Sequence, residues 1–201
     1  MVVPSRRLVL ASASPARLRL LRDAGFDPTV IVSGVDEEVV EIDDGFELVA
    51  TLAEMKARAV AATEGLADAL IVGCDSLFLL DGEVLGKPES TEDAISRWKR
   101  MRGRTGVLLT GHCIIDTASG RVAQEVGDTL VRFADVTDDE IAAYVASGEP
   151  MHVAGAFTQD GRSAVFIEGV DGDATNVIGL SLPLFRRLLL ELGVGVTELW
   201  R

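Results

Sequence analysis

Short apolar runs alternate with longer amphipathic segments along most of this 201-residue chain. An apolar run of a few residues favours a buried strand, and apolar residues spaced by three and four favour a helix. Alternation of the two predicts an α/β fold whose central sheet is at least partly parallel. With 48% hydrophobic residues, the chain can bury a substantial core as one domain, residues 1–201, with room for two lobes.

The expected elements follow from this pattern. We expect strands at Leu8–Ala11, Thr29–Val32, Leu70–Cys74, Val107–Ile115, Arg121–Phe133 and Ala164–Val170. We expect helices at Ser14–Ala24, Phe46–Glu64, Ala94–Met101 and Leu182–Leu192, and another ending near Ser147. Asp81-Gly82 predicts a tight primed hairpin turn, and Thr137 with Glu140 predicts a capping box.

The charge balance limits the classes of partner. Nineteen Lys and Arg against 32 Asp and Glu give a net charge of −13. Nonspecific nucleic-acid binders and anionic-membrane binders rely on summed positive charge, so we expect neither nucleic acid nor membrane as a partner. Any phosphate site must therefore be a local cluster of cations.

Cysteine usage and the N-terminal segment indicate a cytoplasmic protein. Cys74 and Cys113 each lie beside an apolar run, which fits buried thiols in a reducing compartment better than a disulfide. Arg6-Arg7 precedes an apolar stretch too short for an export signal, and Arg17 follows soon after it. No apolar run approaches the roughly 18 residues of a membrane-spanning helix.

The first strand leads into a helix start that is typical of a phosphate site. After Leu8–Ala11, Ser12 and Ser14 supply hydroxyl groups; Ser14 is placed as the N-cap, with Pro15 at the first helical position. The unpaired N–H groups of that turn can bind an anion. Arg17 then opposes the helix dipole unless an anion lies nearby, although an ordinary surface arginine would fit the same pattern.

Two further charged residues occupy unusual places. Asp75 follows the apolar run Leu70–Cys74, so it is expected at the end of a buried strand, where α/β sheets bind ligands and where a carboxylate can ligate Mg²⁺ or Mn²⁺ or orient a water. The alternative is an aspartate that merely ends a strand. Lys56 falls on the apolar stripe of its helix, where it must be paired or must extend to solvent. Lys87, in Gly86-Lys87-Pro88, is weaker by itself, because a loop lysine is common.

These residues lie in a series of blocks that resembles the Maf family of nucleoside triphosphate pyrophosphatases. The family's opening Ala-Ser-x-Ser-Pro-Arg-Arg corresponds to Ala11–Arg17, with Leu20-Leu21 following. The later blocks occur in the same order, from about Leu8 to Gly193: Ser33–Glu37, Lys56–Ala59, Gly73–Ser76, Gly86–Pro88, Gly148–Pro150, Ala154–Phe157 and Asn176–Leu180. Eight blocks in order make the resemblance specific to the family.

The resemblance implies an elongated, strongly twisted mixed sheet flanked by helices, with a cleft between two lobes. It also implies roles for individual residues: Asp75 matches the catalytic aspartate, and Glu37 a carboxylate that helps to bind the divalent metal. Lys56 and Lys87 match lysines that face the phosphates, beside Ser12, Ser14 and Arg17. The cofactor implied is a divalent cation, Mg²⁺ or Mn²⁺.

The chain also departs from the family pattern, which leaves the preferred base open. Ala16 replaces the first of the paired arginines, so one bidentate phosphate contact is missing. Ser76 is near the threonine of pyrimidine-type members. Asp160 stands where that subclass has glutamine and where the 7-methylguanosine-triphosphate subclass has glutamate. These specificity positions point in opposite directions.

The function indicated is hydrolysis of a nucleoside triphosphate, noncanonical or surplus, to its monophosphate and pyrophosphate. The metal and the cations Lys56, Lys87 and Arg17 would offset charge on the leaving group. The alternative is a nucleotide-binding regulator without turnover, linked to cell division, which the loss of arginine at Ala16 would fit. The expected partner is the triphosphate itself, with a homodimer as the candidate assembly.

Overall fold

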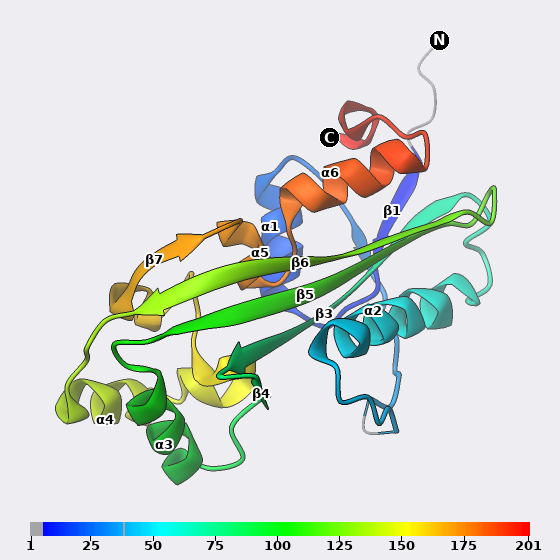
Figure 1. Cartoon of the computed structure of the whole chain (residues 1–201). Coiled ribbons are helices and arrows are strands. Elements are labelled where there is room, and N and C mark those ends of the chain that lie inside the picture. The colour runs from blue at the N-terminus through cyan, green and yellow to red at the C-terminus, as the bar shows by residue number, and fades with distance from the viewer. Residues whose placement is uncertain (1–5, 38) are drawn as a thin grey trace. The chain divides into compact units, whose positions relative to one another are not determined.

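A mixed sheet organises the chain in a computed structural model that describes residues 6–37 and 39–201 (Figure 1). The described residues form one seven-stranded sheet in the order β2, β1, β3, β5, β6, β7, with β4 also paired to β3. Strand β1 is parallel to β2 and β3, whereas β4 is antiparallel to β3 and β7 is antiparallel to β6. The predicted α/β class, with a mixed sheet flanked by helices, is confirmed.

The described strands and helices range from the two residues of β2 to the 17 residues of α2. The strands are β1 (Arg7–Leu10), β2 (Thr29–Val30), β3 (Ala69–Leu80), β4 (Glu83–Leu85), β5 (Thr105–Asp116), β6 (Val122–Phe133) and β7 (Ile167–Asp171). The helices are α1 (Pro15–Asp23), α2 (Gly45–Ala61), α3 (Thr91–Met101), α4 (Asp138–Ala146), α5 (Ala174–Ile178) and α6 (Leu182–Glu191). Short 3₁₀ helices are η1 (Glu149–His152), η2 (Ala154–Ala156), η3 (Arg162–Phe166) and η4 (Val196–Leu199). None of the described helices is long and apolar enough to cross a bilayer.

The chain divides into two compact units. The first unit comprises the residues up to Asp75, Thr110–Gly127 and Gly179–Arg201. The second unit comprises Ser76–Leu109 and Asp128–Ile178. Three of the four boundaries along the chain fall inside a strand: directly after Asp75 in β3, directly before Thr110 in β5 and directly after Gly127 in β6.

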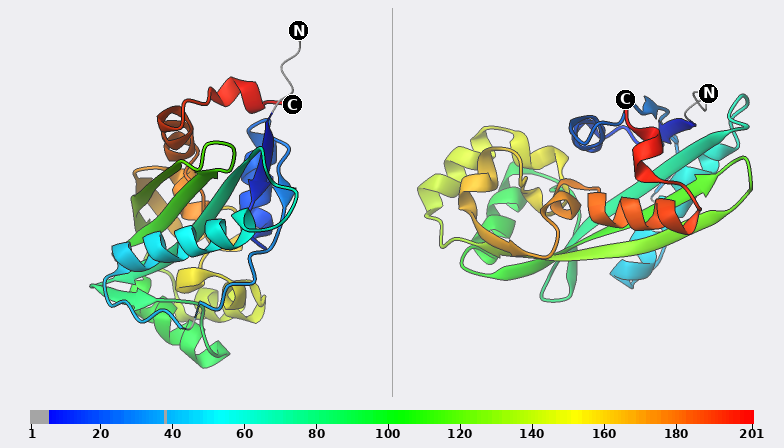
Figure 2. Two further views of the ribbon diagram at one scale, coloured as in Figure 1. Left: turned by 90° about the vertical axis from the view of Figure 1, so that its right-hand side faces the viewer. Right: turned by 90° about the horizontal axis from the view of Figure 1, so that it is seen from above.

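The first unit has a hydrophobic core on each face of its strands. Alternate residues of a strand point to opposite faces. Leu8, Leu10 and Leu70 therefore pack with α1 and α6, while Val9 and Ile71 pack with α2 on the other face. Figure 2 shows the C-terminal segment returning beside the loop after α1, where the structure has a bridge between residues 26 and 200.

The second unit is built around aromatic rings packed edge to face. Trp98 is fully buried on α3, and its ring meets Phe133 and Tyr144 edge to face. The indole N–H donates to the carbonyl oxygen of Ala156 at 2.8 Å, so the one polar atom of this ring is satisfied. Phe78 completes the core from β3.

Local signals were read correctly where they depend on neighbouring residues. The capping box of Thr137 and Glu140 is present at the start of α4. The Asp81-Gly82 turn has positive φ at both residues, 55° and 82°, as a primed turn requires. In both cases the residues that interact are at most three positions apart in the sequence, so distant contacts have little influence on them.

Other boundaries were wrong. The predicted strand Leu70–Cys74 continues as β3 to Leu80, because its polar residue Asp75 is paired rather than exposed, as described below. The first residues of the predicted strand Ala164–Val170 form η3 instead, and β7 begins only at Ile167. The sequence reading also missed the short helix α5.

Candidate active site

Three charged side chains meet in the first unit. The Lys56 ammonium lies 2.6 Å from Oδ1 of Asp75 and 2.7 Å from Oε1 of Glu37. Lys56 is only 8% exposed, and the Asp75 side chain is 14% exposed, whereas the Glu37 side chain is half exposed. A buried ammonium is costly unless it is paired, and here two carboxylates pair it. Of the two alternatives that the apolar stripe left open for Lys56, the structure shows pairing rather than extension to solvent.

Two glycines allow the helix that carries Lys56 to lie close to the sheet. A Cβ at Gly73 would lie 2.2 Å from the carbonyl oxygen of Ala53, and one at Gly111 would lie 2.1 Å from that of Val49. Real Cβ atoms do not make such contacts, so only glycine permits this spacing. Gly73 and Asp75 are two residues apart on β3 and share a face. The close approach of α2 at Gly73 therefore brings Lys56 to Asp75.

Asp75 lies inside a strand rather than at its end, which corrects the sequence reading. Strand β3 runs from Ala69 to Leu80, so Asp75 is at its centre. The neighbouring strand β1, however, pairs with β3 only as far as Val72 and then leaves the sheet toward α1. Asp75 is thus beyond the carboxyl end of β1. The position is still one where α/β sheets bind ligands, although β3 itself does not end there.

The start of α1 has the predicted cap. Ser14 is the N-cap with Pro15 after it, and its hydroxyl accepts a hydrogen bond from the backbone N–H of Arg17 at 3.4 Å. The Ser12 hydroxyl in turn accepts from the backbone N–H of Ser14 at 3.1 Å. Both hydroxyls thus shape the turn whose N–H groups were expected to face an anion. Ala16, which directly precedes Arg17 in the sequence, is half-buried.

Arg17 joins three segments of the first unit. Its Nε donates to the carbonyl oxygen of Gly179 at 2.7 Å, and its Nη1 donates to the carbonyl oxygen of Cys74 at 2.9 Å and to the Ser12 hydroxyl at 3.2 Å. Cys74 directly precedes Asp75. The guanidinium therefore fixes the peptide from which Asp75 projects, a structural contact that the sequence reading did not foresee. Phosphate binding by Arg17 stays a prediction.

The remaining predicted residues belong to the second unit. Ser76 is half-buried in β3, directly after Asp75. Lys87 is exposed in the loop between β4 and α3, and Asp160 is exposed in the turn before η3. The roles of these three residues toward a triphosphate stay predictions.

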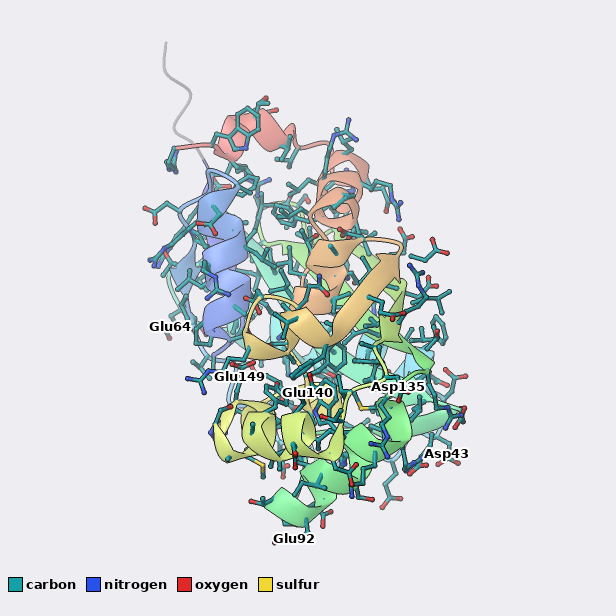
Figure 3. The ribbon with its side chains drawn as sticks, turned by 90° about the vertical axis from the view of Figure 1, so that its left-hand side faces the viewer. Asp43, Glu64, Glu92, Asp135, Glu140 and Glu149 are labelled. Atoms are coloured by element: carbon teal, nitrogen blue, oxygen red, sulfur yellow. The ribbon has the colours of Figure 1, made fainter. Side chains whose placement is uncertain are left out.

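The turn that carries Asp160 is held by Glu149, labelled in Figure 3. The Glu149 carboxylate accepts hydrogen bonds from the Thr158 hydroxyl at 2.6 Å, the backbone N–H of Arg162 at 2.9 Å and the Tyr144 hydroxyl at 3.3 Å. Burial alone would raise the pKa of Glu149, but the hydrogen bonds from Thr158 and Arg162 bring that pKa below its ordinary value. A charged Glu149 therefore organises residues 158–162.

Two thiols and one histidine of the first unit are buried. Cys74 and Cys113 are both free and buried, as expected, and burial raises the pKa of Cys74 to about 11 and that of Cys113 to about 12. His112 is 1% exposed, and its Nε2 accepts from the backbone N–H of Ser181 at 2.8 Å. Within the described residues, no three His, Cys, Asp or Glu side chains form a metal-binding group.

Comparison with known proteins decides the family. The sequence profile of the Maf-like protein family matches residues 7–192. This chain belongs to the Maf family. A Maf relative from Streptomyces coelicolor is 65% identical over 98% of this chain and 96% of its own length. Relatives from Salinispora tropica and Thermosynechococcus vestitus are each 55% identical, covering 96% and 94% of this chain and 87% and 96% of their own lengths. All three are named nucleoside triphosphate pyrophosphatase.

In this Maf chain the charged cluster was predictable, but its supports were not. Lys56, Asp75 and Glu37 each come from a block that resembles the family. Lys56 and Asp75 also had signals of their own, the apolar stripe and the preceding apolar run. Glu149 was part of a recognised block without an assigned role. Gly73 was also part of a recognised block, and no role for it was evident from the sequence. A short side chain or a single carboxylate gives no periodic signal, so only the packed structure shows what it contacts.

Proposed function

We propose that this protein hydrolyses a nucleoside triphosphate between its α and β phosphates and releases the monophosphate and pyrophosphate. The observation that carries this proposal is the buried ammonium of Lys56 held between the carboxylates of Asp75 and Glu37. Such a set can bind both a polyphosphate and a cation. The names of relatives that match nearly the whole chain support the same activity.

The donor set fits a divalent cation of the Mg²⁺ or Mn²⁺ type. Asp75 and Glu37 offer hard carboxylate oxygens, and Mg²⁺ is commonly bound by one or two carboxylates together with substrate phosphates. Within the described residues, no third acidic side chain joins Asp75 and Glu37 to form a metal-binding cluster. Two carboxylates suit a cation that is shared with substrate phosphates better than one enclosed by protein ligands. When bound, the ion would neutralise negative charge on the phosphate oxygens.

Lys56 has a direct role in this scheme. An ammonium has three N–H donors, and two of them face Asp75 and Glu37. The third is left for a phosphate oxygen of the substrate. Because Lys56 is nearly buried, its charge acts in a medium less polarisable than water and stabilises the developing pyrophosphate more strongly.

Asp75 would act on the attacking water or hold the cation. In the reaction, a water oxygen forms a bond to the α-phosphorus while the bond from that phosphorus to the bridging oxygen breaks. Pyrophosphate leaves with the bonding electrons. The proton released by the water passes to Asp75 if this carboxylate is the base, and to solvent if Asp75 is only a cation ligand.

The remaining predicted residues would serve recognition. Lys87 would contact the phosphates, and Ser76 and Asp160 would face the base. Ala16 would leave one phosphate contact of the family pattern unmade. The cellular role that fits this activity is removal of noncanonical or surplus nucleotides in the cytoplasm. A homodimer is the assembly to examine by light scattering.

The test is a panel of ordinary and modified nucleoside triphosphates incubated with the protein and Mg²⁺ or Mn²⁺. Pyrophosphate and orthophosphate are measured separately. Pyrophosphate in equal amount to the monophosphate supports the proposal, and the best substrate names the base. Binding without any turnover would instead favour the nucleotide-binding regulator.

Asp75→Asn and Asp27→Asn form a matched pair of variants, because Asp27 is an exposed aspartate of the same unit outside the cluster. Turnover should be lost in the first and kept in the second. The affinity of Asp75→Asn for Mn²⁺ in the presence of pyrophosphate, measured by calorimetry, separates the two roles of Asp75. A cation ligand weakens Mn²⁺ binding when it is replaced, whereas a pure base does not.

A further inference from the structure

The loop that carries Lys87 is held on both sides of that residue by one ion pair on α3. Arg97 donates from Nη1 to the carbonyl oxygen of Gly86 at 2.7 Å, directly before Lys87. Asp93 accepts at Oδ2 from the backbone N–H of Glu89 at 3.0 Å, two residues after Lys87. The two side chains therefore bind the loop backbone directly before Lys87 and two residues after it.

The two side chains also hold each other. Nε of Arg97 donates to Oδ1 of Asp93 at 3.0 Å, and Nη2 lies 2.7 Å from Oδ2. This bidentate geometry is the strong form of an arginine–carboxylate pair. Arg97 is 14% exposed at its side chain, so the pair is better shielded than an ordinary surface ion pair. We refer to Asp93 and Arg97 as the loop clamp.

Other contacts make the loop a rigid support. The backbone N–H of Gly155 donates to the same Gly86 carbonyl oxygen at 3.1 Å. Pro88 is buried and its ring restricts the backbone directly after Lys87. Lys87 itself is exposed, and no polar contact of its ammonium is present within the described residues. These contacts hold the backbone on both sides of Lys87, while its side chain stays exposed.

We propose that Arg97 and Asp93 are positioning residues that aim Lys87 at the phosphates of the substrate. This inference rests on the proposed function, in which Lys87 contacts those phosphates. A flexible loop would have to lose conformational freedom each time a polyphosphate binds, and that loss weakens binding. The clamp removes most of this freedom in advance. Arginine is required because a lysine cannot make the bidentate pair and the bond to Gly86 together.

A double-mutant cycle tests the inference. Lys87→Met, Arg97→Gln and the double variant are compared with the parent by kcat/KM for the best triphosphate and by Kd for inorganic pyrophosphate. Arg100→Gln is the matched control, because Arg100 is on the same helix and its ion pair with Glu83 does not touch the loop. Melting temperatures are recorded for every variant.

Lys87→Met should lower kcat/KM about tenfold to hundredfold, the usual effect of losing a charged hydrogen bond. Arg97→Gln should lower it about tenfold, mainly through KM, and Arg97→Lys should be nearly as impaired although it keeps the charge. In the Lys87→Met background, Arg97→Gln should change kcat/KM and Kd by less than about twofold. Arg100→Gln should leave both values near those of the parent.

Three results would overturn the inference. If Arg97→Gln has the same effect with and without Lys87, Arg97 acts on stability or on the phosphates directly. If Arg97→Lys restores full activity, only charge matters and the clamp does not. If Lys87→Met changes neither kcat/KM nor the Kd for pyrophosphate, Lys87 binds no phosphate. If the parent protein shows no turnover, the proposed function is refuted but the inference is not. The double-mutant cycle measured by the Kd for pyrophosphate still tests the loop clamp.

Discussion

Replacing Gly73 by alanine would place a methyl group where α2 meets β3. The new Cβ would lie 2.2 Å from the carbonyl oxygen of Ala53, and also 2.8 Å from the backbone nitrogen and 2.9 Å from the Cβ of Ala57. Ordinary contact begins at 3.4 Å, so α2 must move away from the strand by about 1 Å. The atoms in the way belong mostly to the helix backbone, which a side-chain rotation cannot clear.

The cost can be estimated from this overlap. Overpacking of a core typically costs about 1–3 kcal/mol. In a chain of this size, that loss corresponds to a fall in melting temperature of roughly 2–12 °C. Lys56 lies on the displaced turn and would move relative to Asp75. A misplacement of about 1 Å at a reacting centre can cost about a hundredfold in rate, so we expect kcat/KM to fall between tenfold and a hundredfold.

Gly111→Ala is the matched comparison, since its Cβ would meet the same helix at Val49, one turn before Ala53. Calorimetry should give similar falls in melting temperature for the two variants. Steady-state kinetics should show a clearly larger loss of kcat/KM for Gly73→Ala. An unchanged melting temperature in Gly73→Ala would show that the helix is not closely seated there. Equal kinetic losses in both variants would refute the link between Gly73 and the position of Lys56.

Three further predictions concern charged side chains. Asp75→Asn should lower kcat by a factor of about 10² to 10⁴ with the melting temperature preserved, and activity within about tenfold of the parent would exclude the residue from catalysis. The Arg6 guanidinium lowers the pKa of Asp116 from 3.8 to about 2, so this carboxylate stabilises the fold above about pH 4 and the contribution is lost as pH falls toward 2. Asp116→Asn should therefore cost about 2 kcal/mol in urea unfolding at pH 7 and much less near pH 2, and a difference independent of pH would contradict the pairing. Asp160→Gln should shift kcat/KM toward pyrimidine triphosphates, because an acidic side chain accepts hydrogen bonds but donates none, and Ser76 should limit the size of the shift. An unchanged ratio of kcat/KM for pyrimidine and purine triphosphates would place Asp160 outside the base pocket.

Features that depend on near neighbours could be predicted from the amino-acid sequence. The Ser14 cap with Pro15 after it, the capping box at Thr137 and the turn at Asp81-Gly82 were all read correctly. The stripe of α2 placed Lys56 on the apolar face and left pairing and extension to solvent as alternatives, of which the structure shows pairing. The cap, the capping box and the turn each join groups within four residues of one another, so local propensity carries the information.

The contacts between distant segments could be identified only in the folded chain. Asp75 seemed to end a strand, because a carboxylate in an apolar run has no local partner; its partner Lys56 lies 19 residues away on another element. Arg17 reaches Gly179 across 162 residues, and the loop of Gly86 depends on Arg97 and on Gly155. Such contacts form because packing brings distant backbone groups together and because buried polar groups must then be paired, and neither condition is visible in a window of sequence.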